Sequence, residues 1–393
     1  MTDASRTPVA APRSPGRAIA VSVLRRSGAR LGLAWIGLLV LFAILAPVLA
    51  SSQPLVALVE GRWTIPLLDD LRPTDGILLG LLPAVLVLWW WRHRPRRAWA
   101  LAIAVVGLAA ISSHLLLDPS RISVHEQHRE LAVGGQLEWA LWAPIPYSPT
   151  DYLRDHGETG LEPPLASAPE RTHWLGTEAG GADLASGMIH ASRVALGIGL
   201  VATGIALFIG VIIGGLMGYF SGVVDIIGMR IVEIVEAIPT LFLLLIFVAF
   251  FGRNLYLMMV IIGLTSWSGY ARYVRAEFLK LREVDYVQAA VVAGLPLRSI
   301  LFRHMLPNGF APVMVTASFG VASAILAEAT LSFLGLGPTG APTWGQMLDQ
   351  AVQSSTFNWW MAAFPGGAIF LTVFAYNLLG EALRDAVDPG TRQ

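Results

Sequence analysis

Long runs without a charged residue dominate this chain and limit what it can fold into. A helix that crosses a membrane needs about 17 to 25 mostly apolar residues. Eight runs of about that length or longer occur, at 31–50, 76–91, 98–117, 194–224, 237–252, 254–271, 305–327 and 350–380. The second and fifth runs are slightly short; we expect Arg92 to extend the second by snorkelling, and a helix reaching back through Ile231 to extend the fifth. The chain is therefore predicted to be an all-α polytopic membrane protein with about eight transmembrane helices.

The overall composition agrees with this prediction. Charged residues make up 14% of the chain, against about 25% in soluble domains. The formal net charge is zero, so a nucleic-acid binder is not expected. The absence of cysteine excludes disulfides, thiolate metal sites and thiol nucleophiles. The first run could be a secretory signal, but it is longer than a usual signal core and further spans follow, so we expect a transmembrane helix.

The arginines indicate how the spans are oriented, because basic residues in short loops stay on the cytoplasmic side of a membrane. Arginines are frequent before the first run and in the loops 92–97 and 272–303, and they are scarce in the other short loops. Eight spans then place both termini in the cytoplasm, in a multi-pass protein of the inner (cytoplasmic) membrane. Segment 118–193, rich in Pro, Gly and acidic residues, is expected outside the cytoplasm. Residues 1–17 are expected to form a disordered tail.

Several motifs that would indicate an enzyme are incomplete. A phosphate-binding loop needs a lysine, and the only lysine is Lys280 in a Phe-Leu-Lys-Leu context. The glycines of segment 335–340 fit a dinucleotide pattern, but they follow a membrane span instead of a strand, which indicates a turn-rich loop. His125 and His128 are three residues apart instead of the four of a helical zinc motif, which favours a polar surface run. We therefore predict no catalytic, cofactor or metal site in this chain.

The polar stretch between Arg272 and Pro307 is longer than two neighbouring spans require. It is predicted to contain two short helices, at 284–293 and 296–305, with a break at Gly294. Glycine is favoured where a helix ends in a left-handed turn, and proline is favoured in the first turn of the next helix. Amphipathicity alone would equally fit a helix pair lying on the membrane surface.

The amino-acid sequence of this stretch is more informative than its amphipathicity. It contains Tyr286-Val-Gln-Ala-Ala-Val-Val-Ala-Gly-Leu-Pro-Leu, followed by a His-Met-Leu-Pro-Asn segment that ends at Asn308. This resembles the Glu-Ala-Ala loop of ABC importer permeases, with Gln in place of Glu and the spacing intact. In that family the loop is the coupling helix that seats in a groove on the ATPase subunit. The resemblance implies that the coupling residues are Gln288, Ala289, Ala290, Gly294, Arg298, Arg303, His304, Leu306 and Pro307.

The resemblance covers residues 173–390 and is closest to the second permease of dipeptide, oligopeptide and nickel importers. It also rests on Trp174-Leu-Gly-Thr, on Trp344-Gly-Gln-Met-Leu, and on the segment 377–389. The long outer loop is similar to that of the microcin C type of peptide permease. One departure stands out: the branch usually has Gly-Thr-Asp-x-x-Gly-Arg-Asp, whereas this chain has Glu178 and Ala182 at the Asp and Arg positions. An outer-gate role of that Arg is therefore in doubt here.

The resemblance implies that the chain forms half of a pore for peptides or peptide-like solutes. The implied partners are a second homologous permease, two ABC ATPases that use ATP and Mg²⁺, an extracytoplasmic solute-binding protein and membrane lipid, with no nucleic acid. Import of nickel or another small solute is the alternative within the same class. A self-contained secondary transporter or membrane enzyme is the alternative from another class, and no residue favours it.

These expectations divide the chain into consecutive parts. They are a cytoplasmic basic tail (1–30), a first transmembrane helix (31–50), an outer loop (51–75), an inserted transmembrane hairpin (76–117), an extracytoplasmic loop (118–190), a permease core (191–385) with its coupling loop (272–308), and a cytoplasmic tail (386–393).

Three acidic residues within or beside the spans are candidates for the translocation path or a gate. An ionised acid at mid-membrane costs about 2.5 to 3.5 kcal/mol. Glu328 therefore either lies on the translocation path or lies near the outer boundary of the membrane, hydrogen-bonded to a neighbouring helix. We favour the second position. Glu233 and Glu236 lie one turn apart. Glu233 shares a helix face with Arg230, three residues away, which favours an ion pair with a packing role.

Overall fold

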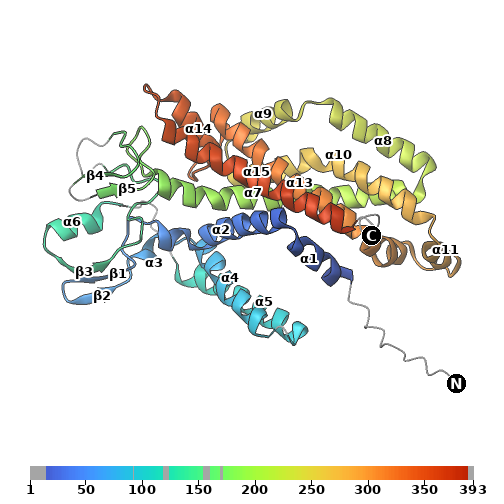
Figure 1. Cartoon of the computed structure of the whole chain (residues 1–393), viewed down its shortest axis with the longest axis horizontal. Coiled ribbons are helices and arrows are strands. Elements are labelled where there is room, and N and C mark those ends of the chain that lie inside the picture. Colours follow the sequence, from blue (N-terminus) through green and yellow to red (C-terminus); the bar gives the residue numbers. More distant parts are fainter. Residues whose placement is uncertain (1–14, 92, 118–123, 154–159, 169–170, 388–393) are drawn as a thin grey trace, which may run out of the picture.

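The computed structural model describes residues 15–91, 93–117, 124–153, 160–168 and 171–387. Helices dominate these ranges, and most of the long ones run along the long axis of the molecule (Figure 1). Six of the described helices are long and apolar enough to cross a membrane, and a bent pair, α8 and α9, would make a seventh. The prediction of an all-α polytopic membrane protein is confirmed. The six are α2 (Ser27–Leu49), α4 (Pro73–Trp90), α5 (Pro95–Leu116), α7 (Leu184–Phe220), α13 (Leu306–Leu331) with the helical turns that flank it, and α15 (Trp359–Val387).

The fifth apolar run does not form the single helix that we predicted. α8 (Gly222–Ala237) ends before Pro239 and α9 (Thr240–Phe251) starts after it, with a bend of 75° between them. Proline lacks an N–H and disfavours helical geometry in the residue before it. Ile238 is accordingly extended, with φ −85° and ψ 119°. The expected extension back through Ile231 is wrong, because the helix that contains Ile231 points in another direction.

The sixth run lies within α10 (Leu255–Arg282), which is 28 residues long and packs against α7 along a row of glycines. Cβ atoms added at Gly210, Gly214 and Gly218 would lie 2.5, 2.3 and 2.6 Å from atoms of α10. The three glycines are four residues apart and so share one helix face. Small residues at this spacing allow two membrane helices to approach closely.

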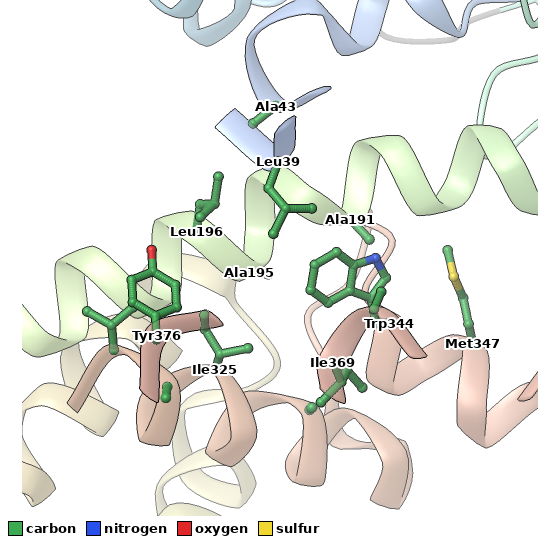
Figure 2. Close-up of a cluster of buried hydrophobic side chains, with 14 of the residues drawn as sticks. Leu39, Ala43, Ala191, Ala195, Leu196, Ile325, Trp344, Met347, Ile369 and Tyr376 are labelled. Atoms are coloured by element: carbon green, nitrogen blue, oxygen red, sulfur yellow. The ribbon is translucent and has the colours of Figure 1, made fainter. Parts of the chain in front are cut away.

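A buried apolar cluster joins α2, α7, α13 and α15 to a short helix, α14 (Trp344–Gln353) (Figure 2). Leu39 of α2 and Ile325 of α13 both belong to it. The Trp344 indole N–H donates to the carbonyl oxygen of Met188 in α7, at 3.3 Å. α14 is separated from α13 by a π-helical segment, η3 (Ser332–Leu336), and by the predicted turn-rich loop, in which Gly335 has a φ of 76°.

The described part of the predicted outer loop is folded, which we did not foresee. Three antiparallel strands form a sheet in the order β2-β1-β3, and two more form the hairpin β4–β5. Val56 pairs with Leu141 and Val59 with Leu137, so β1 and β3 are joined across the whole inserted hairpin. The elements are β1 (Val56–Val59), β2 (Arg62–Thr64), β3 (Leu137–Leu141), β4 (Ala166–Ala168), β5 (Arg171–His173), α3 (Leu67–Asp70) and α6 (Gln127–Val133).

A buried carboxylate, Asp151, holds this outer region together. It accepts a hydrogen bond from Arg129 at 2.7 Å, and it is also bonded to the Ser52 hydroxyl and to the backbone N–H of Leu153. Burial alone would raise the pKa of Asp151, but the hydrogen bonds from Arg129 and Ser52 and the arginine charge lower it below its ordinary value. The carboxylate is therefore ionised and links segments that are about 100 residues apart.

The hairpin of α4 and α5 is joined to the rest of the bundle near the end that carries the strands. Asp75 in the first turn of α4 forms an ion pair with Arg193 of α7. Arg193 also donates to the carbonyl oxygens of Ala43 and Ile44 in α2. One arginine thus joins three helices, and the hairpin diverges from α2 toward its turn (Figure 1).

The basic N-terminal segment is helical from Pro15 onward, so the expected disorder does not extend to residues 15–17. α1 (Pro15–Arg25) lies beside the end of α15 (Figure 1). Arg26 forms an ion pair with Asp385 there. The remainder of the expected disordered tail, and residues 388–393, lie outside the described residues.

Candidate functional site

The connection from α10 to α13 is built differently from the predicted loop with two separate helices. α10 continues through Arg282, so the polar stretch begins as helix and not as loop. After α11 (Asp285–Val292), a turn leads into α12 (Leu297–Ser299) and the π-helical η2 (Ile300–Met305), which runs directly into α13. The second predicted helix is therefore the start of α13, and α11 alone projects from the bundle as a separate short helix, seen at the right of Figure 1.

Gly294 ends α11 in the way its sequence predicts. Its φ is 71°, a left-handed conformation that glycine adopts without strain. The Gly294 N–H donates to the carbonyl of Val291 at 2.9 Å, and the Leu295 N–H donates to that of Ala290 at 3.2 Å. These two bonds form a Schellman motif, which satisfies the last carbonyls of the helix. The predicted break at Gly294 is confirmed.

One face of α11 is fixed against the bundle. Val287 and Ala290 are buried in a cluster with Phe278 of α10 and Ile300 and Met305 of η2. Ala290 therefore packs against this chain itself, whereas Ala289 is exposed. α11 is therefore packed against α10 and against η2, the segment that runs into α13.

The C-terminal end of α11 and the turn that follows it are exposed and apolar. Val292 is 86% exposed, Val291 44% and Leu295 37%. Arg298, three residues after Leu295, is exposed, and so is Arg303 of η2. An apolar tip followed by cations, at the end of a helix packed against the bundle, is typical of a protein contact surface.

The remaining predicted coupling residues have local roles. The Gln288 amide donates to the carbonyl of Arg282 at 2.9 Å, which fixes the start of α11. His304 Nδ1 lies 2.9 Å from the carbonyl oxygen of Ser299. Leu306 and Pro307 form the first turn of α13. Of the predicted set, Ala290 faces inward.

The three acidic candidates for a translocation path are not brought together. Glu328 is buried near the far end of α13, where the Ser332 hydroxyl donates to it at 2.5 Å. Glu233 pairs with Arg230 at 2.6 Å, as its spacing predicts. Glu236 forms an ion pair with Arg272 of α10. The Glu236 pair links α8 to α10, whereas the Glu233 pair lies within α8.

Sequence reasoning missed a hollow of about 260 Å³ at the end of the bundle that carries the strands. Glu178 and Ala182 from the turn before α7, Arg253 from the turn before α10, and Gln350 of α14 are among its lining residues. Burial raises the pKa of Glu178 to about 7, and a hydrogen bond with the Gln350 side chain acts in the opposite direction. The only sequence signal was the departure from the Asp and Arg of the family pattern at this turn.

Comparisons with known proteins agree with this architecture. Residues 210–393 match the family described as "Binding-protein-dependent transport system inner membrane component". The oligopeptide transport system permease protein OppC of Haemophilus influenzae is 38% identical over 232 residues, which cover 58% of this chain and 74% of that protein. The dipeptide transport system permease protein DppC of Alkalihalophilus pseudofirmus is 32% identical over 300 residues, or 76% of this chain and 90% of that protein. The inner membrane ABC transporter permease protein YejE of Escherichia coli is 36% identical over 253 residues, or 64% and 72%.

Proposed function

The chain belongs to the family of binding-protein-dependent transport system inner membrane components, and from this premise we propose that it forms half of the pore of an ABC importer for peptides or peptide-like solutes. The family and the named relatives support a transport subunit of the inner membrane. The observation that carries the mechanism is the exposed apolar tip of α11, packed against α10 and η2.

The tip of α11 is the proposed contact with an ABC ATPase. Val291, Val292 and Leu295 would enter a groove on that partner, and burial of their apolar surface would drive the contact. Arg298 and Arg303 would pair with acidic groups beside the groove. Two such ATPases, which use ATP and Mg²⁺, would serve this chain and a second permease; the lack of a phosphate-binding lysine in this chain supports that division of labour.

The second permease would cover α8 and α9. These helices carry a row of exposed apolar side chains, and Val232 is the one buried residue of α8 in the described structure. Ile226, Ile234 and Phe250 are 62%, 65% and 81% exposed. Lipid would cover the rest of the apolar surface, and an extracytoplasmic solute-binding protein would deliver the solute to the opposite end of the bundle.

The geometry supplies a simple route for coupling. Closure of the ATPases on ATP would push α11, and because α11 packs on α10 and on the segment that runs into α13, the push would tilt these helices together. The pore would pass between an inward-facing and an outward-facing state, with the balance set by nucleotide. In this scheme the coupling loop (272–308) belongs to the permease core (191–385), and the hairpin (76–117) is an addition to it.

A charge at the tip of α11 tests the proposed contact. Val292→Asp should abolish co-purification of the ATPases and peptide uptake in reconstituted vesicles, because a carboxylate cannot enter an apolar groove without losing its hydration. Val292 is so exposed that folding should be unaffected. The matched control is Val133→Asp in α6, at a residue that is 88% exposed at the opposite end of the molecule. Wild-type uptake by the Val292 variant would refute the role of the tip.

A further inference from the structure

The turn between α4 and α5 concentrates positive charge. Residues 76–117 contain no Asp or Glu, whereas Arg92, Arg94, Arg96 and Arg97 lie within six residues. Arg94, Arg96 and Arg97 are exposed, and the ion pairs found in the described residues involve other cations. Because Arg96 and Arg97 follow the start of α5 at Pro95, they also lie at the positive end of a helix dipole. A bound anion would relieve this repulsion.

The same turn is rich in tryptophan and contains a hollow. Trp89, Trp90 and Trp99 are 64%, 75% and 60% exposed. Trp90, Trp91, His93 and Arg94 line a hollow of about 230 Å³. Exposed tryptophans are typical of the depth at which lipid headgroups meet the hydrocarbon. The hollow therefore lies where a lipid phosphate would be.

Below the turn, the hairpin exposes apolar side chains that acyl chains could cover. Val85 and Leu86 of α4 and Ile103 and Leu108 of α5 are 60% to 68% exposed. The hairpin joins the bundle near its other end through the Asp75 ion pair and diverges from α2 toward the turn (Figure 1). Lipid can therefore reach the turn and the adjoining apolar surface together.

We propose that the α4–α5 turn binds the phosphate headgroup of an anionic phospholipid in the cytoplasmic leaflet. The orientation of the turn rests on the arginine distribution and not on the proposed transport function. Arginines would contact the phosphate, the tryptophans would lie at the interface, and the apolar faces of α4 and α5 would contact the acyl chains. Charge complementarity favours a lipid over a protein segment, because the patch combines cations with interfacial aromatics directly above an apolar surface.

Retention of lipid by the purified full-length chain tests this proposal. The protein is reconstituted in vesicles of equal parts phosphatidylglycerol and phosphatidylethanolamine and re-extracted in mild detergent, and the retained lipids are counted by native mass spectrometry. The Arg96→Gln/Arg97→Gln variant should lower the ratio of phosphatidylglycerol to phosphatidylethanolamine by about tenfold or more, since a charge-assisted hydrogen bond from an arginine to the bound phosphate contributes about tenfold to binding at that site.

The matched control is Arg25→Gln/Arg30→Gln, which removes two exposed arginines from the expected cytoplasmic side, at α1 and α2. This control should retain phosphatidylglycerol as the wild type does. Equal retention by the Arg96/Arg97 variant, or equal loss in the control, would overturn the proposal. Displacement of the lipid by excess inorganic phosphate would indicate a site for free anions instead. Loss of a co-purifying protein from the Arg96/Arg97 variant alone would indicate that the turn binds a protein partner. Either result would also overturn the proposal. None of these outcomes depends on peptide uptake.

Discussion

Replacing Gly214 with alanine should loosen the contact between α7 and α10. The added Cβ would lie 2.3 Å from the carbonyl oxygen of Ala271 and 3.0 Å from its Cα. Ordinary van der Waals contact begins at 3.4 Å, so the shortfall is about 1 Å. Both neighbouring atoms belong to the backbone of a 28-residue helix. The clash can therefore be relieved only by moving the two helices apart.

The expected loss of stability follows from this separation. Overpacking costs about 1 to 3 kcal/mol, and a gap of about 1 Å also weakens the close contacts at Gly210 and Gly218, so we expect the upper end. Alanine is favoured over glycine within a helix by about 1 kcal/mol, which leaves a net loss of roughly 2 kcal/mol. With about 2 to 4 °C per kcal/mol for a domain of a few hundred residues, the melting temperature should fall by roughly 4 to 8 °C.

Thermal unfolding of the purified protein in mild detergent measures this effect. Gly204→Ala is the matched control, because Gly204 lies in the same helix and nothing lies within 4 Å of its added Cβ. The control carries the same gain in helix propensity without the clash, so its melting temperature should equal or exceed that of the wild type. If Gly214→Ala melts no lower than Gly204→Ala, the glycine row does not set the distance between α7 and α10.

Two predictions concern carboxyl groups of the outer region. The pKa of Glu178 is about 7 in the folded protein, against an ordinary value of 4.5. Protonation of Glu178 therefore stabilises the fold, and this contribution is lost as the pH rises through 7. Glu178→Gln should remove up to about 3 kcal/mol of this pH dependence, measured as the difference in melting temperature between pH 5 and pH 8. An unchanged difference would contradict it. Asp151 has a lowered pKa, so its contribution is present at neutral pH and lost in acid. Asp151→Asn should remove the buried carboxylate from its ion pair with Arg129 and cost about 3 kcal/mol, seen as faster proteolysis of this region. Proteolysis at the wild-type rate would show that the ion pair is dispensable.

The parts of the fold that depend on local sequence could be predicted. A charge-free run must become a helix in a membrane, because every backbone polar group has to be bonded within the segment. The break at Gly294 follows from the left-handed turn that glycine permits. The Arg230–Glu233 pair follows from helical spacing alone. Each of these requires only neighbouring residues.

The features that were missed depend on contacts between distant segments or on a local signal that was not weighed. Pro239 is a local signal for a helix end, yet it was treated as a residue inside an apolar run. The pairing of β1 with β3 joins segments about 80 residues apart, which no local pattern indicates. That Ala290 packs inward on α11 depends on how Phe278 and Ile300 surround it. The hollow at Glu178 is lined by segments that are far apart in the sequence, among them the turns before α7 and α10 and the helix α14. The row of glycines from Gly210 was visible in the sequence as a spacing of four.

The pairing of β1 with β3 has an evolutionary consequence. Val59 lies opposite both Arg62 of β2 and Leu137 of β3, so the chain leaves this sheet after β2 and returns to it at β3, on the other side of β1. The segment between β2 and β3, which includes α4 and α5, therefore begins and ends at the same sheet. An even number of membrane crossings leaves the orientation of every later helix unchanged. A segment of this kind can be gained, lost or exchanged in one genetic step without changing the membrane orientation of the helices that follow. The β1–β3 pairing marks the site at which such an exchange would occur.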